Sequence, residues 1–242
     1  MGRLWGALVA LFLVAGACTS GNAASRPATT TPAAGAQSAV AKTQSMLLLL
    51  SDVPAGWKSY SPRAVDVGPN AGPAGGLTAC LHSDAGLFRH DRPGHVFVSS
   101  HVYQSPEYIA LIENLDVAPD AAAAEGDFAV LAKPAFPACL GQAYGAVLSG
   151  ELVAQGYHNP TVAATNAAPL AVPAVGDRSS AFRVSDTIVV SGQPQYVYTD
   201  VILFQEGRTT GMLQFERVFS AVPGDLEQQL TAKAANRVTS VH

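Results

Sequence analysis

Hydrophobic residues along the chain change their spacing near residue 150. Before that point, apolar residues recur at helical spacing in residues 121–132 and 138–148. After it, they alternate with polar residues in four stretches, the period of β-strands. These stretches are residues 162–172, 180–190, 196–205 and 209–219. Short turns join the last three, so the pattern predicts neighbouring antiparallel strands.

Four further segments complete the predicted pattern. Residues 39–52 read as a short helix ending in four leucines, and residues 95–103 as a strand. Ser105-Pro106-Glu107 is typical of a helix start and predicts a helix over residues 108–115. A last helix begins near Pro223, with an apolar stripe of Leu226, Leu230, Ala234 and Val238. The predicted fold class is therefore α+β, with an antiparallel sheet of about four or five strands packed with helices.

The first 18 residues read as an export signal that ends at a cysteine. Met1-Gly2-Arg3 is a short positive region, and residues 4–14 are apolar, too short for a membrane helix. Gly16 and Ala17 then precede Cys18, as bacterial lipoprotein processing requires. We predict a cleaved signal peptide over residues 1–17 and acylation of Cys18, for example with palmitate. An ordinary secretory leader cleaved near Ala17 is the alternative.

Residues 18–38 are rich in Ser, Thr, Ala, Gly and Pro, a composition that cannot form a core. We expect a flexible tether there, with a root-mean-square reach of roughly 25 Å. A single extracytoplasmic domain would follow over residues 39–242, held on the outer face of the cell membrane by the lipid.

Composition narrows the class of partner. The chain is 48% hydrophobic and 13% charged, with a formal net charge of −4, so it can bury a sizeable core. It has no basic runs, so no nucleic-acid partner is expected. Contact with the membrane is expected through the acyl chain and not through charge. The Ala, Gly and Pro richness is associated with actinobacterial proteins.

Two cysteines remain after lipidation, Cys80 and Cys139. An even pair in an exported protein predicts a disulfide, since oxidising compartments favour one. Two separate buried thiols are the alternative.

Two short motifs in this sequence resemble those of a known group of proteins. Asp52-Val53-Pro54-Ala55-Gly56-Trp57 follows the leucines, and Val175-Gly176-Asp177-Arg178-Ser179 precedes the strands. With the separated cysteines, this layout resembles a group of actinobacterial envelope lipoproteins and the extracellular PknH-like sensor domains of mycobacterial receptor kinases. The resemblance implies an α+β envelope domain that binds or senses something, in a group whose members mostly lack an assigned catalytic activity. That sensor family typically has two disulfides, whereas this domain can form one.

The candidate ligand-binding residues are aromatic. Tyr196, Tyr198 and Phe204 share one face of a predicted strand, and the other candidates are Tyr103, Phe128 and Tyr144. We expect a groove between a sheet face bearing Tyr103, Tyr196, Tyr198 and Phe204 and the helices carrying Phe128 and Tyr144. It would take an envelope lipid or glycolipid, or a partner protein. Ordinary core packing is the competing interpretation.

Enzymatic signals are weak. There is no Gly-x-Ser-x-Gly, His-Glu-x-x-His, Cys-x-x-Cys or Gly-x-Gly-x-x-Gly motif after a strand. His82, His90 and His95 lack a closely spaced ligand pair, so no metal and no cofactor are predicted. A non-enzymatic binding or sensing lipoprotein is the favoured function. The alternatives are an envelope hydrolase with a dispersed His/Asp/Ser site, using His101 or His95 as base, and a structural partner protein.

Overall fold

A computed structural model describes residues 34–61, 73–82, 92–154, 157, 161–190 and 192–241. The leader, Cys18 and most of the expected tether lie outside the described residues. The strands are β1 (Lys58–Tyr60), β2 (Val96–Ser99), β3 (Val102–Gln104), β4 (Ala110–Val117), β5 (Thr161–Pro169), β6 (Arg178–Val190), β7 (Gln193–Glu206) and β8 (Thr209–Val218). The helices are α2 (Ala34–Ser45), α3 (Pro73–Leu81), α4 (Ala121–Ala129), α5 (Phe136–Ala154) and α6 (Gly224–Val241), with a 3-10 turn, η1 (Val130–Ala132).

All eight strands belong to one antiparallel sheet with the order β1-β3-β4-β8-β7-β6-β5, and β2 pairs with β4. The α+β class is confirmed. The predicted number of four or five strands is wrong, because β1, β2 and β3 are short and β4 has a helix-like sequence. The four strands expected after residue 150 are all present as β5 to β8.

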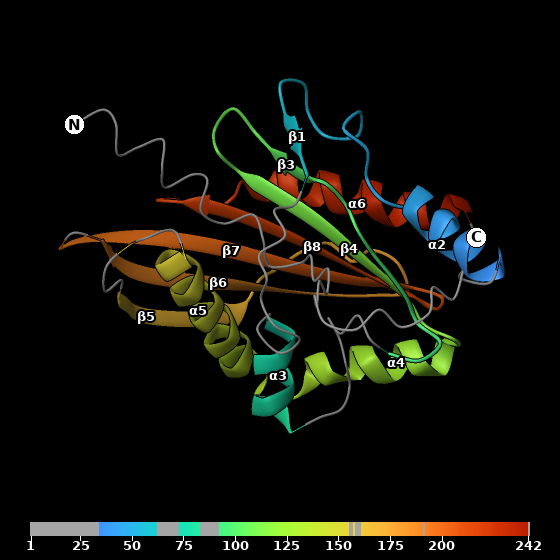
Figure 1. The fold of residues 1–242 in the computed structure, drawn as a ribbon, viewed down its shortest axis with the longest axis horizontal. Helices are drawn as coiled ribbons and strands as arrows, with labels where there is room; N and C mark the ends of the chain where they lie inside the picture. The colour runs from blue at the N-terminus through green and yellow to red at the C-terminus, as the bar shows by residue number, and fades with distance from the viewer. Residues whose placement is uncertain are drawn as a thin grey trace, which may run out of the picture.

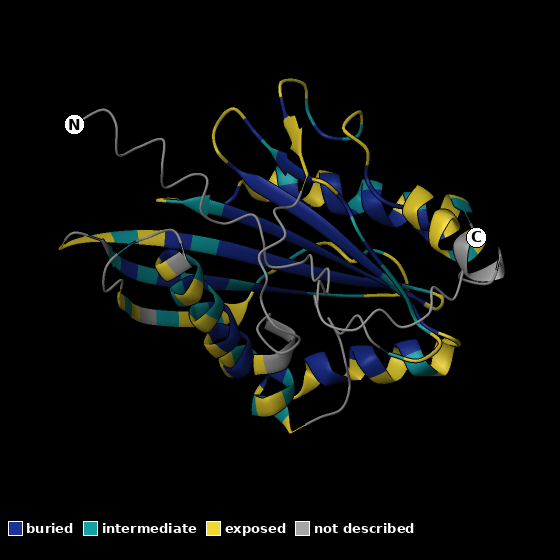
Figure 2. Ribbon diagram, in the orientation of Figure 1, coloured by how far each residue is buried: buried dark blue, intermediate teal, exposed yellow. Residues whose placement is uncertain are grey.

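Helices cover both faces of the sheet (Figure 1). On one face, Phe204 and Phe215 pack with Leu230 of α6 and Leu48 in a first core cluster. On the other face, α3, α4 and α5 cover a second cluster that includes Leu203 and Leu140. Burial is densest in the middle of β4, β7 and β8 (Figure 2). Within the described residues, no helix combines the length and the apolar character that spanning a bilayer requires.

The predicted helices at the two ends of the domain differ in outcome. In α6, the stripe is confirmed: Leu230, Ala234 and Val238 are fully buried and Leu226 packs against the same cluster. The first helix starts earlier and ends earlier than predicted, because α2 begins at Ala34, inside the expected tether, and stops at Ser45. Beyond it the leucines are in a turn, in which Leu49 and Leu50 are about half exposed.

The helix predicted over residues 108–115 is wrong. Those residues include most of β4, which lies between β8 on one side and β2 and β3 on the other. The Ser105 hydroxyl does accept bonds from Glu107 N and Ile109 N, but these bonds close a turn into a strand. Pairing with two neighbours overrides the helix propensity of the Ala-Leu-Ile-Glu-Asn-Leu run.

The strand predicted over residues 95–103 is present in two pieces. The pairing with β4 changes from Ser99↔Asn114 to Tyr103↔Leu111, a register shift of one residue. The extra residue turns Tyr103 onto the same face as Val98, in the first cluster, and not onto the opposite face as the alternation predicts.

The helices on the second face agree better with the prediction from the sequence. Asp120 caps α4 by accepting a bond from Ala123 N at 2.8 Å, and α5 extends the helix predicted over residues 138–148 at both ends. The short helix α3 was not predicted, since Pro73 and two glycines mark this segment as a loop.

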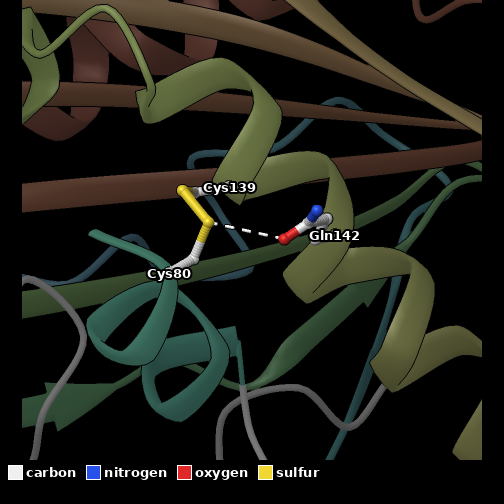
Figure 3. Close-up of a disulfide and its surroundings, with 3 residues drawn as sticks. All are labelled: Cys80, Cys139 and Gln142. Atoms are coloured by element: carbon white, nitrogen blue, oxygen red, sulfur yellow. Dashed lines mark hydrogen bonds between the residues drawn. A yellow bond between two sulfur atoms is a disulfide. The ribbon is translucent and has the colours of Figure 1, made fainter. Parts of the chain in front are cut away.

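The disulfide predicted between Cys80 and Cys139 is confirmed. It joins α3 to α5 across 59 residues, with a Cα–Cα distance of 5.6 Å. The Cys80 sulfur also lies 3.4 Å from Gln142 Oε1, on the next turn of α5 (Figure 3).

Candidate functional site

The six candidate aromatic residues do not meet in one groove. Tyr103 and Phe204 are buried in the first cluster, where the Tyr103 hydroxyl donates to the Leu48 carbonyl at 2.6 Å. Phe128 and Tyr144 are buried in the second cluster, on the opposite side of the sheet. The groove expected between these two sets is therefore not formed, because the sheet itself lies between them.

The remaining two candidates are at the sheet surface. Tyr196 is 49% exposed and Tyr198 is half-buried, both near the start of β7. The alternation in β7 follows the prediction, since Phe204 and Val201 are in different clusters. The prediction failed in its choice of helices: α6 covers the face that includes Phe204, whereas α4 and α5 cover the other.

A small cavity lies between α5 and the second face of the sheet. Its lining comes from α5 (Tyr144, Val147, Leu148, Glu151), β6 (Asp186), β7 (Val197, Thr199) and β8 (Gln214, Glu216). The α5 residues are spaced three or four apart, so they share one side of the helix. The cavity offers about 20 Å³, room for roughly one water-sized group.

Three of the lining residues are acidic, and each comes from a different element. Asp186 is 3% exposed and accepts a bond from the Thr165 hydroxyl at 2.5 Å. Glu216 is 8% exposed, and its carboxyl has no hydrogen-bond donor among the described residues. Glu151 is at the half-buried end of the lining, on α5. The Tyr144 hydroxyl donates to Gln214 Oε1 at 3.0 Å.

Burial raises the pKa of all three carboxyls. The pKa of Glu151 is raised to about 7 and that of Asp186 to about 6, in both cases by desolvation. Desolvation raises the pKa of Glu216 well above its ordinary value, and the charges of Glu151 and Asp186 raise it further. No lysine or arginine is in the lining to oppose these shifts.

Several other buried or half-buried carboxylates in the described part of the chain pair with an arginine. Arg183 donates to both oxygens of Asp200, at 2.6 and 2.7 Å. The other pairs are Arg92 with Asp127 and Asp116, and Arg237 with Asp52. The cavity carboxyls thus lack a compensation that the fold supplies elsewhere.

A larger groove runs along the neighbouring side of α5, beside β5. It measures about 660 Å³ and is lined by Pro134, Pro137, Ala138, Gly141, Gln142, Gly145, Val162, Thr165, Asn166 and Ala167. None of these side chains is charged. Close packing of the helix on β5 requires glycine: a Cβ at Gly145 would lie 2.8 Å from Thr165 Oγ1. Thr165 lines the groove and bonds to Asp186 of the cavity, so the two hollows are neighbours.

A third cluster, around His95, contains the histidine and carboxylate side chains that a hydrolase or a metal site would use. His95 Nδ1 lies 2.9 Å from Asp116 Oδ1, and one ligand atom each from His95, Asp116 and Asp127 lie within 4.8 Å of one another. Arg92 donates to Asp127 and lies 3.9 Å from Asp116, so a cationic side chain already lies beside the two carboxylates. This position is therefore better explained as an ion-pair network than as a metal site.

The histidines do not form a catalytic pair with a serine in the described residues. The hydrogen-bond partner of His95 is Asp116, and no serine hydroxyl bonds to its ring. His101 and His82 are exposed, and His90 is outside the described residues. The hydrolase alternative consequently lacks a placed nucleophile among these residues.

Comparisons with known proteins find likeness in structure. No protein-family model and no curated protein matches the chain. The extracellular domain of PknH from Mycobacterium tuberculosis aligns with a TM-score of 0.43 and 11% identity, over 81% of this chain and 94% of that chain. LpqN, involved in cell envelope biogenesis of Mycobacterium tuberculosis, aligns with a TM-score of 0.26 and 13% identity, over 78% of each chain. These neighbours are of the kind that the sequence resembles, and at such low scores no residue role is transferred from them.

Proposed function

We propose that the chain is a non-enzymatic lipoprotein, anchored through Cys18 on the outer face of the cell membrane, whose domain binds an uncharged envelope ligand. The groove between α5 and β5 is the binding site. The observation that carries this proposal is a groove of about 660 Å³ with no charged side chain in its lining. Ligand pockets of small molecules typically measure roughly 300–1,000 Å³.

The chemistry of the lining favours a glycan or the sugar part of a glycolipid. Gln142, Thr165 and Asn166 offer amide and hydroxyl groups that pair with sugar hydroxyls. Pro134, Pro137 and neighbouring small residues offer apolar surface to a ring or an alkyl chain. A groove of this polarity disfavours a phosphate group, because it presents no cation.

Recognition of a partner protein is a second candidate, and the sheet order supports it. β5 is the last strand of the sheet, and α5 covers one face of it. An extended segment of another protein could pair with the edge of β5 that no described strand occupies, as in β-strand addition. A ligand in the groove would be a glycan or glycolipid, whereas a ligand at the edge of β5 would be a protein. Mass spectrometry distinguishes the two.

The test is a pair of tryptophan substitutions on α5. Ala138 and Ala146 are both exposed on the helix, but Ala138 lines the groove and Ala146 does not. We expect Ala138→Trp to fill the groove and to abolish co-purification of the ligand, whereas Ala146→Trp keeps it. The measurement is native mass spectrometry with lipid extraction on the full chain from an actinobacterial host.

Two outcomes would contradict the groove proposal. One is a wild-type chain that carries no glycan or lipid but pulls down a protein, which favours the β5 edge. The other is equal retention of the ligand by both tryptophan variants, which would place the ligand elsewhere.

A further inference from the structure

We infer that the acidic cavity between α5 and the sheet binds the protonated amine at the end of an unbranched alkyl chain. Lysine side chains and alkylamines share this chemistry. The inference concerns a different hollow from the groove, so it does not depend on what occupies the groove.

The first step is charge. Glu151, Asp186 and Glu216 line one cavity, and no lysine or arginine is in its lining. Several other buried carboxylates of the fold pair with arginine, for example Asp200 with Arg183 at 2.6 Å. Buried carboxylates are costly without a partner, so the cavity favours a ligand that brings the missing positive charge.

The second step is the unpartnered acceptor. Glu216 is 8% exposed and lines the cavity, and its carboxyl receives no hydrogen bond from the described residues. Thr199 and Gln214 line the same space with further oxygen acceptors. An ammonium group has three N–H donors, so it can bond to Glu216 and to neutral acceptors together.

The third step is size and shape. The space of about 20 Å³ holds roughly one water-sized group, and an –NH₃⁺ group is of that size. A guanidinium, a trimethylammonium or an amine on a sugar ring is too bulky. Because the ammonium fills this space, the attached methylene groups would extend out of the cavity past Val147 and Glu151, the half-buried residues of its lining.

A metal ion fits less well than an amine. In the described residues, the group of three side chains whose ligand atoms lie within 4.8 Å of one another is His95, Asp116 and Asp127, and none of these lines the cavity. The three cavity carboxyls are farther apart. Glu216 would therefore contact the ammonium, while Glu151 and Asp186 act through their charge.

The cavity also predicts how binding depends on pH. Its ionisable groups are Tyr144 and Glu151 from α5, Asp186 from β6 and Glu216 from β8; β7 contributes none. Burial raises the pKa of each carboxyl and of Tyr144, so the empty cavity holds protons at acid pH. An alkylamine stays protonated to a pKa of about 10, so binding should strengthen from pH 5 to pH 8.

The experiment measures amine binding by the full chain in detergent micelles. NMR titrations at pH 8 would use n-butylamine, Nα-acetyl-lysine methylamide, glucosamine and tetramethylammonium. We expect the first two to shift resonances of the cavity residues and the last two not to. At pH 5, n-butylamine should bind at least about threefold more weakly.

Variants locate the site. Glu216→Gln should weaken binding of n-butylamine by about tenfold or more, because a buried charge pair is lost. Glu125→Gln, an exposed carboxylate paired with Arg178 outside the cavity, should leave it unchanged. Glu151→Gln, at the half-buried end of the lining, provides a second variant that folds if Glu216→Gln does not. We expect Glu151→Gln to weaken binding of n-butylamine by about threefold.

Three results would overturn the inference. They are no amine binding at pH 8, equal binding by the Glu151→Gln and Glu125→Gln chains, and equal binding of glucosamine and n-butylamine. If no amine binds while the groove ligand still co-purifies, this inference is wrong and the proposed function stands.

Discussion

Several carboxyl groups are buried in this domain, and burial raises their pKa values. Glu113 in β4 is fully buried; its Oε2 accepts a bond from Leu48 N at 2.6 Å, whereas its Oε1 has no partner among the described residues. Desolvation raises the pKa of Glu113 to about 8. Burial and a hydrogen bond with Asp200 raise the pKa of Glu227 to about 9. These shifts act in the same direction as those of the acidic cavity.

We predict that the free energy of unfolding falls as the pH rises from 5 to 8. The unfolded Glu113 carboxyl ionises near pH 4.5, whereas the folded one keeps its proton up to about pH 8. In this pH window the folded state binds more protons than the unfolded state. The contribution of Glu113 to the free energy of unfolding is therefore fully present below about pH 4.5 and falls as the pH rises to about 8. Each such group lowers the free energy of unfolding by about 1.4 kcal/mol per pH unit across this window. Urea unfolding at pH 5, 6, 7 and 8 measures the slope.

A substitution assigns part of that slope to one residue. Glu113→Gln should flatten the pH dependence, even if it lowers stability at every pH, while Glu125→Gln should keep the wild-type slope. A wild-type domain whose stability rises between pH 5 and pH 8 would contradict the prediction.

Residue-scale evidence for the cavity was present in the sequence but incomplete. Asp186 interrupts the apolar alternation between Val184 and Ile188, and Glu216 follows Phe215 in a buried strand. An acidic residue at an inward-facing position is a recognisable signal of a special site. That Glu151 joins them depends on how α5 crosses the sheet, and no local pattern encodes this.

At the scale of elements, the disulfide joins the short helix α3 to the long helix α5, whose inner side is part of the core. α3 has nine residues and includes two glycines, and Leu77 is its buried apolar anchor. Cys80 fastens it to α5, which borders both the groove and the cavity. The disulfide therefore supports the helix on which both proposed sites depend.

We predict that Cys80→Ala/Cys139→Ala lowers the free energy of unfolding by about 4 kcal/mol, the chain-entropy value for a loop of this length. Urea unfolding of the double variant and of the wild type measures it. Wild type treated with a reductant should match the variant, and the variant itself should not respond to the reductant. A loss below about 1 kcal/mol would show that α3 is held by packing alone.

β4 illustrates why element type was mispredicted at one place. Its residues favour a helix locally, and Ser105 supplies a cap-like hydroxyl before it. In the fold, Leu111 and Leu115 are on one face and Ile112 on the other, and all three are buried. Burial on both faces of a central strand outweighs the local preference.

At the scale of the whole molecule, the proposed anchor places the domain at the membrane surface. The leader, Cys18 and residues 19–33 are outside the described residues, so this part of the proposal rests on the sequence. We predict that Cys18→Ser moves the chain from the membrane fraction to the soluble fraction, since acylation would be its membrane attachment. Fractionation with a labelled fatty acid measures it.

Ser45→Ala, in α2, is a matched control that should keep both the label and the membrane location. A Cys18→Ser chain that still incorporates the fatty acid would contradict the lipoprotein assignment. A chain that loses the label but stays in the membrane fraction would point instead to an uncleaved leader or to a membrane partner.

The sequence by itself determined the class of fold, the disulfide pair, the strands β5 to β8 and the buried stripe of α6, because each follows from local periodicity or from cysteine number. Tertiary structure decided which helices cover which face, and so placed Phe204 and Tyr144 on opposite sides of the sheet. It also turned residues 110–117 into a central strand and brought Glu151, Asp186 and Glu216 together. These outcomes depend on pairing and packing between residues far apart in the chain, and spacing along one segment does not specify such contacts.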